Sequence, residues 1–291
     1  MSKDAIERSN DGDVVADINY FPATGKPISK ASWKPRYLGE PDQFTRSMTI
    51  RDARGKEEDF DLNMKGFTFI RLPPASRVTR EDDEETVKRS YYPELEEIAK
   101  KLTGASKAHV FNHVMRAHTS PASKGIQDAQ GRWQDIPAGH PHVDYADTSG
   151  AMLGTRAELN LPLSIDTLFD TSSRYAFLGM WRPLKTVRRD PLAVCDATTV
   201  PDKDYQVRLR EFSRTGIKSA NYVMSHADEK ETHEWWYLSQ MQPDEMVVFK
   251  GFDTKQDLPG WRCPHTAFRV KGSEKEEARE SVEARVICFW D

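Results

Sequence analysis

The sequence predicts a mainly β fold with flanking helices, built around a double-stranded β-helix, the cupin-like jelly roll. Many short runs of strand character are separated by loops, and a strong helical pattern occurs only in the first third of the chain. The 291 residues contain no internal repeat and can bury a sizeable core within one domain. We therefore expect residues 61–291 to form the β-helix domain and residues 1–60 to form an N-terminal arm packed on it.

The first strand is expected at residues 66–72, ended by Pro73 and Pro74. A helix is expected at residues 81–103, because acidic residues fill its first turn, an apolar stripe follows, and Gly104 provides a C-cap. Pro93 either kinks this helix or begins a second one. We expect the helix to pack against a sheet.

The rest of the chain has mainly strand character. Strands are expected at 109–116, 175–181, 192–195, 221–225, 234–239, 245–250, 266–270 and 281–289. The last run alternates, with Val282, Ala284, Val286 and Cys288 on one face and Glu283, Arg285 and Ile287 on the other. This pattern is typical of a strand with two different environments.

Composition argues against several classes of function. The net charge is −4, from 42 basic and 46 acidic residues, so a basic surface for nucleic acid is not expected. Cys195, Cys263 and Cys288 form no C-x-x-C pair, which indicates a reducing compartment. No run approaches the roughly 18 apolar residues of a membrane-spanning helix. We expect a cytoplasmic monomer or homodimer that uses neither nucleic acid nor a membrane.

Five dispersed residues suggest a chemistry. His142 and Asp144 form an H-x-D pair, and His265 lies far downstream. Two imidazoles and one carboxylate are the ligands of a non-haem Fe(II) centre with open positions, and an i,i+2 spacing at a strand end places both side chains on one face. Arg279 and Ser281 follow as R-x-S, which suits the far carboxylate of a dicarboxylate cosubstrate.

Each of these residues also has an ordinary explanation when taken alone: a polar loop, a structural histidine, or a salt-bridged surface arginine. Their order and spacing argue for the combination. Arg279 follows His265 by fourteen positions, which is enough for a strand, a turn and the start of an antiparallel partner. We therefore expect Arg279 to lie beside His265, one strand over.

Four further residues are candidates for the site. Arg182 follows Trp181 at a probable strand end and could hold the cosubstrate's 1-carboxylate or the substrate, or form a structural ion pair. Arg116, Tyr145 and Trp181 are candidates for contacting the substrate. Asp196 is expected to cap a helix or turn instead of binding a ligand.

Several segments resemble one family. They are His142-Val143-Asp144-Tyr145, Trp181-Arg182-Pro183-Leu184, the block from Asp190 to Asp196, Trp235-Trp236-Tyr237, and Pro264 to Phe268. From about residue 60 to its end, the chain is similar to the fungal hydroxylase/desaturase family typified by AsaB and gibberellin desaturase, within the Fe(II)/2-oxoglutarate oxygenases. It departs from the family at Leu178-Gly179-Met180, where a more polar run with Asn is expected, and this bears on the substrate pocket.

The resemblance implies an enzyme that uses Fe(II), 2-oxoglutarate and O₂, with ascorbate as a candidate reductant. His142, Asp144 and His265 would be the catalytic metal ligands, and Arg279 with Ser281 would hold the 5-carboxylate of 2-oxoglutarate. The reaction would oxidise a C–H bond of a small molecule in fungal secondary metabolism, by hydroxylation, desaturation or ring closure. An amino acid or other small carboxylic acid is a candidate substrate. Two alternatives are a cupin-like metal enzyme that does not use 2-oxoglutarate and a metal-free β-sandwich binding protein.

Overall fold

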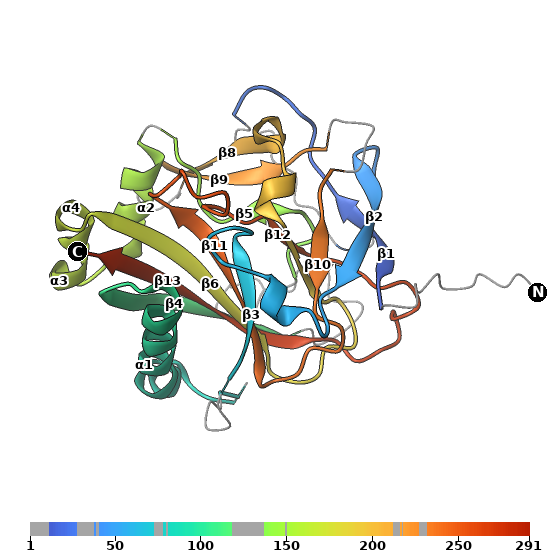
Figure 1. Ribbon diagram of the computed structural model, residues 1–291, viewed down its shortest axis with the longest axis horizontal. Helices are drawn as coiled ribbons and strands as arrows, with labels where there is room; N and C mark the ends of the chain where they lie inside the picture. Colours follow the sequence, from blue (N-terminus) through green and yellow to red (C-terminus); the bar gives the residue numbers. More distant parts are fainter. Residues whose placement is uncertain are drawn as a thin grey trace, which may run out of the picture.

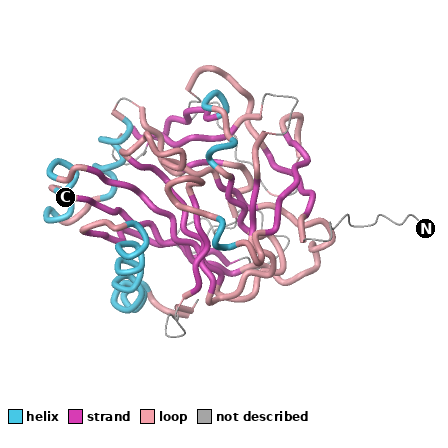
Figure 2. The backbone as a smooth tube through the Cα atoms, viewed as in Figure 1, coloured by secondary structure: helices cyan, strands magenta, loops and turns pink. Residues whose placement is uncertain are grey.

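Two curved β-sheets make up most of the protein (Figure 1). The computed structural model describes residues 12–27, 38, 41–72, 78–79, 81–117, 137–148, 150–211, 216, 218–226 and 232–291. Figure 2 shows that the strands occupy the middle of the molecule, while most of the helical segments lie toward one end. A mainly β fold with flanking helices is therefore confirmed.

The larger sheet has eight strands, and most of its neighbours are antiparallel. The exception is β10, which runs parallel to β2. The order across the sheet is β1 (Val14–Asn19), β2 (Thr45–Asp52), β10 (Trp235–Tyr237), β7 (Leu192–Cys195), β12 (His265–Ala267), β5 (His142–Val143), β9 (Lys218–Met224) and β8 (Tyr205–Glu211).

The smaller sheet has five antiparallel strands. Their order is β3 (Phe67–Arg71), β11 (Glu245–Asp253), β6 (Arg174–Pro183), β13 (Glu280–Trp290) and β4 (Lys107–Ala117). An apolar cluster joins the inner faces of the two sheets, with Val194 and Trp236 from the larger sheet against Phe67, Trp181 and Phe249 from the smaller one. The interior between two such sheets can enclose a cavity.

The helical segments lie outside the sheets. They are α1 (Glu84–Thr103), α2 (Ala151–Leu159), α3 (Leu163–Asp166) and α4 (Leu168–Thr171), with 3₁₀ turns η2 (Glu57–Asp59), η3 (Ala197–Thr199) and η4 (Asp202–Asp204). None of the described helices is long and apolar enough to cross a membrane.

The predicted first helix is present as α1, which continues through Pro93. The Asp83 side chain accepts a hydrogen bond from the Thr86 backbone N–H at 2.7 Å, and Gly104 ends the helix with φ of 71°. The apolar stripe of α1 packs against outward-facing residues of the five-stranded sheet, among them Val282 and Ala284. The expected helix-on-sheet packing is therefore confirmed.

The alternation of the last strand is also confirmed and decides which residues face the interior. Val282, Ala284, Val286 and Cys288 of β13 lie in the apolar cluster beneath α1, while Ile287 and Phe289 lie in a separate cluster with Tyr145 and Phe177. Since successive strand residues point to opposite faces, Ser281, Glu283 and Arg285 share the inward face with Ile287.

The sequence analysis missed four strands and three short helices. Strands β1 and β2 lie inside the predicted N-terminal arm and extend the eight-stranded sheet through the pairing of β2 with β10. The division of the chain at residue 60 stays a prediction. Residues 1–11 and 28–37 of the arm, and the strand-ending Pro73 and Pro74, lie outside the described residues.

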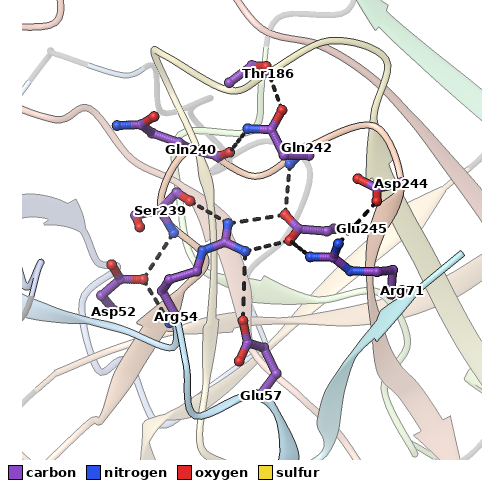
Figure 3. Close-up of polar contacts among 10 residues, drawn as sticks. All are labelled: Asp52, Arg54, Glu57, Arg71, Thr186, Ser239, Gln240, Gln242, Asp244 and Glu245. Atoms are coloured by element: carbon purple, nitrogen blue, oxygen red, sulfur yellow. Dashed lines mark hydrogen bonds and ion pairs between the residues drawn. The ribbon is translucent and has the colours of Figure 1, made fainter.

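A buried carboxylate ties the segment after β2 to the five-stranded sheet (Figure 3). Arg54 donates to both carboxylate oxygens of Glu245, at 2.5 and 3.1 Å, and Arg71 of β3 donates to the same group at 3.0 Å. Arg54 also donates to the Ser239 carbonyl oxygen at 2.6 Å. Burial opposes ionisation of Glu245, but hydrogen bonds from Arg54 and from the Gln242 backbone prevail and lower its pKa.

We predict that Glu245→Ala lowers the free energy of unfolding by about 2 kcal/mol at neutral pH, because charge-assisted hydrogen bonds from a partly buried arginine are lost. Glu84→Ala is the matched control: it removes an exposed helical pair with Lys88 and should cost about 0.5 kcal/mol or less. Urea unfolding measures both. Since the pKa of folded Glu245 is lowered, its contribution is complete above the ordinary glutamate range and is lost as pH falls below about 4. Equal losses for both variants would contradict this role.

Candidate metal centre

Two histidines that are remote in sequence face each other across adjacent strands. His265 of β12 pairs directly with His142 of β5 in the antiparallel ladder, and their ring centroids lie 4.4 Å apart. Directly opposed residues in a sheet project to the same face, so both imidazoles point into the space between the sheets. His265 is buried, and the His142 side chain is 16% exposed.

The backbone orients both imidazoles in the same way. His142 Nδ1 lies 3.0 Å from the His140 carbonyl oxygen, and His265 Nδ1 lies 3.2 Å from the Cys263 carbonyl oxygen. A carbonyl oxygen can only accept, so each Nδ1 carries the hydrogen and each Nε2 keeps its lone pair. This is the arrangement in which an imidazole binds a metal through Nε2.

Asp144 completes the set. Its Oδ1 lies 3.8 Å from His142 Nε2, and the ligand atoms of His142, Asp144 and His265 all lie within 4.8 Å of one another. The other carboxylate oxygen, Oδ2, lies 3.3 Å from Nε of Arg285. One oxygen therefore faces the imidazoles and the other faces a guanidinium. Two imidazoles and one carboxylate on one side fit Fe(II), with coordination positions left for other ligands.

The electrostatics keep the three groups in their metal-binding forms. Burial, reinforced by the neighbouring His265, holds the pKa of His142 well below its usual value, so the ring is neutral near pH 7. Burial opposes ionisation of Asp144, but the charges of Arg285, His265, His142 and Arg210 together outweigh it and lower the pKa of that carboxyl. Arg285 is itself paired with Asp144 and Glu283, and these carboxylates raise its pKa despite its burial.

An aromatic ring from the five-stranded sheet packs against the His265 imidazole. Phe249 of β11 lies with its ring centroid 4.2 Å from that of His265, at an interplanar angle of 38°. This packing requires a glycine at position 179 of β6, because a Cβ there would lie 2.4 Å from the Phe249 ring. The absence of a side chain at Gly179 makes room for the ring that packs against His265.

Arg279 and Ser281 each keep one buried hydrogen-bond donor that has no partner among the described residues. Arg279 Nη1 donates to the Asp190 carbonyl oxygen at 2.7 Å, while Arg279 Nε and Ser281 Oγ have no hydrogen-bond partner among the described residues. Burial, followed by the nearby Arg116, lowers the pKa of Arg279 to about 9. Buried donors of this kind are costly unless a ligand satisfies them, and a carboxylate does so.

The expected neighbourhood of Arg279 and His265 is wrong in detail. Strand β12 pairs with β5 and β7, whereas β13 pairs with β4 and β6 in the other sheet. The residues between them cross from one sheet to the other instead of forming a hairpin. Arg279 lies against Trp181, with its guanidinium carbon 5.2 Å from the ring centroid, and Trp181 shares an apolar cluster with the Phe249 that supports His265.

Arg182 is not brought into the interior. Its guanidinium lies over the Tyr91 ring of α1, 5.6 Å from the centroid, on the outer face of the five-stranded sheet. Strand alternation explains this: Trp181 faces inward, so the next residue faces outward. The predicted role of Arg182 in holding the cosubstrate is therefore not supported by its position.

Of the candidates for contacting the substrate, Arg116 and Trp181 lie near Arg279, and Tyr145 lies near Asp144. Arg116 of β4 pairs with Ser281, so it lies near Arg279 rather than among the metal ligands. Trp181 packs against Arg279. Tyr145 lines a pocket beside Asp144, and its ring packs at a tilt against Phe177 with centroids 4.4 Å apart. Asp196 caps the η3 turn by accepting from the Thr198 backbone N–H at 3.0 Å, as expected.

The sequence analysis missed the interior role of Arg285. Its inward direction was visible in the alternation of the last strand, but its contact with Asp144 depends on how the two sheets face each other. Asp190 was also missed: it adopts a left-handed conformation, with φ of 55°, while its carbonyl oxygen accepts from Arg279. No local pattern signals that geometry.

Comparisons with known proteins show which family the chain belongs to. Residues 8–289 match the model of a family described as "Oxidoreductase/YMDC permease-like domain". The "Hydroxylase/desaturase efuI" of Hormonema carpetanum is 32% identical over 265 residues, covering 85% of this chain and 84% of that protein. The chain belongs to the fungal hydroxylase/desaturase family. The resemblance found in the sequence is thereby confirmed.

Two further relatives extend the comparison. The "Alpha-ketoglutarate-dependent dioxygenase phiK" of Fungal sp. (strain ATCC 74256) is 30% identical and covers 96% of this chain and 97% of its own length. The solved structure of "iron and alpha-ketoglutarate-dependent endoperoxidase NvfI" superposes with a TM-score of 0.76 at 24% identity, over 96% of this chain and 98% of that one. This structural likeness shows that the chain shares the jelly-roll fold of that protein.

We predict that Gly179→Ala lowers the affinity of this protein for Fe(II) by about 10-fold or more, because an added Cβ displaces Phe249 from its packing against His265. Anaerobic Fe(II) titration measures the affinity. The double variant Gly179→Ala/Phe249→Leu removes the clash and should recover part of the loss. An unchanged affinity in Gly179→Ala would show that Phe249 does not position the ligand.

Proposed function

We propose that this protein is an Fe(II)/2-oxoglutarate-dependent dioxygenase that oxidises a C–H bond of a small molecule, by hydroxylation, desaturation or oxidative cyclisation, in secondary metabolism. His142, Asp144 and His265 hold the iron. The observation that carries this proposal is the convergence of these three remote ligands, with their ligand atoms within 4.8 Å of one another. The family's dioxygenase and hydroxylase/desaturase names support the same reaction class.

Arg279 and Ser281 bind the 5-carboxylate of 2-oxoglutarate in this proposal. Both are buried on the inner side of the five-stranded sheet, and both retain a donor without a described protein acceptor. The Asp190 carbonyl oxygen fixes one end of the Arg279 guanidinium, and Trp181 supports its face. A preorganised arginine loses little freedom when it binds a planar carboxylate.

When bound, iron and 2-oxoglutarate activate O₂ and supply the oxidant, with succinate and CO₂ as the products of the cosubstrate. The chain supplies position and environment. The two backbone-anchored imidazoles and the Arg285-anchored carboxylate would hold the metal and would leave coordination positions for the cosubstrate and O₂. Phe249 and Trp181 keep the neighbouring interior apolar.

A cupin-like metal enzyme that does not use 2-oxoglutarate would share the three ligands but would have no use for Arg279 and Ser281. A metal-free binding protein would need neither set, and the family membership does not favour it. In our proposal the enzyme works in the cytoplasm as a monomer or homodimer, without nucleic acid, and ascorbate serves as a candidate reductant.

The proposal is tested by adding 2-oxoglutarate to the Fe(II)-loaded protein without oxygen. We expect a weak visible charge-transfer band, which requires both iron and a chelating cosubstrate. His265→Ala should abolish both the band and retention of one iron per chain. If Fe(II) is retained but no band forms, the enzyme without 2-oxoglutarate is the better assignment.

We predict that Arg279→Gln raises the 2-oxoglutarate concentration for half-maximal band intensity by about 100-fold or more. The substitution leaves the buried 5-carboxylate without its guanidinium partner, and an unpaired buried charge costs several kcal/mol. Arg182→Gln is the control, since Arg182 lies beneath α1. It should leave that concentration unchanged, even if the fold becomes less stable. Equal effects of the two substitutions would contradict the assignment of Arg279.

A further inference from the structure

A buried carboxylate between two arginines lies next to the Arg279 guanidinium. It belongs to Asp190, which is 1% exposed and lies just ahead of β7. Asp190 Oδ1 accepts a hydrogen bond from Arg269 Nε at 3.0 Å, and Oδ2 accepts one from Arg189 Nε at 3.2 Å. Each carboxylate oxygen therefore has a cationic partner, and charge-assisted hydrogen bonds of this kind hold the side chain firmly.

The backbone of Asp190 has an uncommon conformation. Its φ is 55°, in the left-handed region that residues other than glycine seldom adopt. Pro191 follows directly and restricts the residue before it further. Such a conformation persists where the surrounding structure fixes it, and here the two arginines hold the side chain. In this conformation the Asp190 carbonyl oxygen accepts from Arg279 Nη1 at 2.7 Å.

Arg189 extends these contacts to the segment that leads to Arg279. It is buried, and its Nη1 donates to the carbonyl oxygens of Glu274 and Glu276, both at 3.2 Å. One guanidinium therefore contacts the Asp190 carboxylate and two points on the segment that crosses between the sheets. The path of that segment toward Arg279 is thus tied to Asp190.

The hydrogen bond from Arg279 to Asp190 links the two sheets. Strand β7, which follows Asp190, pairs with β12 in the eight-stranded sheet, where Val194 lies opposite His265. Arg279 comes directly before β13 of the five-stranded sheet. The Asp190 carbonyl oxygen therefore holds the guanidinium in place relative to the strands beside a proposed metal ligand.

We propose that Asp190 is a positioning residue for the cosubstrate. Held by Arg189 and Arg269, it presents its carbonyl oxygen to Arg279 and leaves the remaining donors of that guanidinium for the 5-carboxylate of 2-oxoglutarate. Arg279 Nε is one of these donors, since it has no hydrogen-bond partner among the described residues. This inference rests on the proposed function, because it requires Arg279 to bind the cosubstrate. It adds that affinity for the 5-carboxylate depends on a side chain whose own oxygens are both occupied by arginines.

The test compares two keto acids on the Fe(II)-loaded protein without oxygen. 2-Oxopentanoate has the same number of carbons as 2-oxoglutarate but carries a methyl group in place of the 5-carboxylate, so it can chelate iron and cannot pair with Arg279. Titration of each acid, followed by the charge-transfer band, gives its half-saturating concentration. We expect the unmodified protein to prefer 2-oxoglutarate by about 100-fold or more, because the methyl group leaves a buried guanidinium without an anion.

Three variants measure the contribution of Asp190 to that preference. Asp190→Gly keeps the left-handed backbone accessible but removes the carboxylate. It should reduce the preference by about 10-fold or more, through weaker binding of 2-oxoglutarate, because groups in one hydrogen-bond network are coupled. Asp190→Asn tolerates the same backbone and keeps an acceptor for one arginine, so it should retain part of the preference. Arg189→Gln leaves the pair of Asp190 with Arg269 in place and should reduce the preference in the same direction.

Asp253→Ala is the matched control. Asp253 is also a buried aspartate that contacts two cations, Arg174 and Lys250. It pairs with Ala176, whereas Ser281 pairs with the opposite end of β6. The substitution should leave the preference for 2-oxoglutarate unchanged, even if the fold becomes less stable.

The outcomes separate this inference from the proposed function. A band that is missing from the unmodified protein, or that forms equally well with both keto acids, contradicts the proposed function, and the inference fails with it. A normal band whose preference survives both Asp190→Gly and Arg189→Gln overturns the inference alone. Equal weakening of the two keto acids in those variants, or the same loss of preference in Asp253→Ala, would indicate general damage to the fold and also overturns it.

Discussion

The pairing of β12 with β5 is the constraint on which the site depends. It places His265 directly opposite His142, and each ring is locked by a hydrogen bond from Nδ1 to the carbonyl oxygen two residues earlier. A ladder position fixes a side chain more firmly than a loop does, because a shift of one residue would turn the imidazole to the opposite face. The centre is thus built into the sheet before any ligand binds.

The five-stranded sheet contributes the side chains that surround this pair of histidines. Phe249 of β11 packs against His265, and Arg285 of β13 lies beside Oδ2 of Asp144. Arg279, directly before β13, is the cosubstrate anchor in the proposed function. Anchoring one carboxylate oxygen to a guanidinium leaves the other for the metal. The proposed metal site therefore depends on how the two sheets pack. In the proposed function, a change in that packing would disturb the positions of iron, cosubstrate and substrate together.

Sequence alone predicted the jelly-roll class, the first helix with its cap, most strands, and three candidate metal ligands that the structure brings together. Those successes depend on local patterns and on the spacing of chemically distinctive residues. What it could not predict are contacts between the sheets. Arg182 and Trp181 are adjacent in sequence but face opposite sides, and the segment before Arg279 crosses between sheets. Gly179 is required because the Phe249 ring of a neighbouring strand occupies the space of a Cβ, and no local sequence pattern predicts this contact.

Anomalous diffraction at the iron absorption edge, from crystals grown anaerobically with Fe(II), tests the central claim most directly. One strong peak per chain is expected within bonding distance of His142 Nε2, His265 Nε2 and a single oxygen of Asp144, with the second oxygen still beside Arg285. Iron located elsewhere, or bound without one of those imidazoles, would contradict the account.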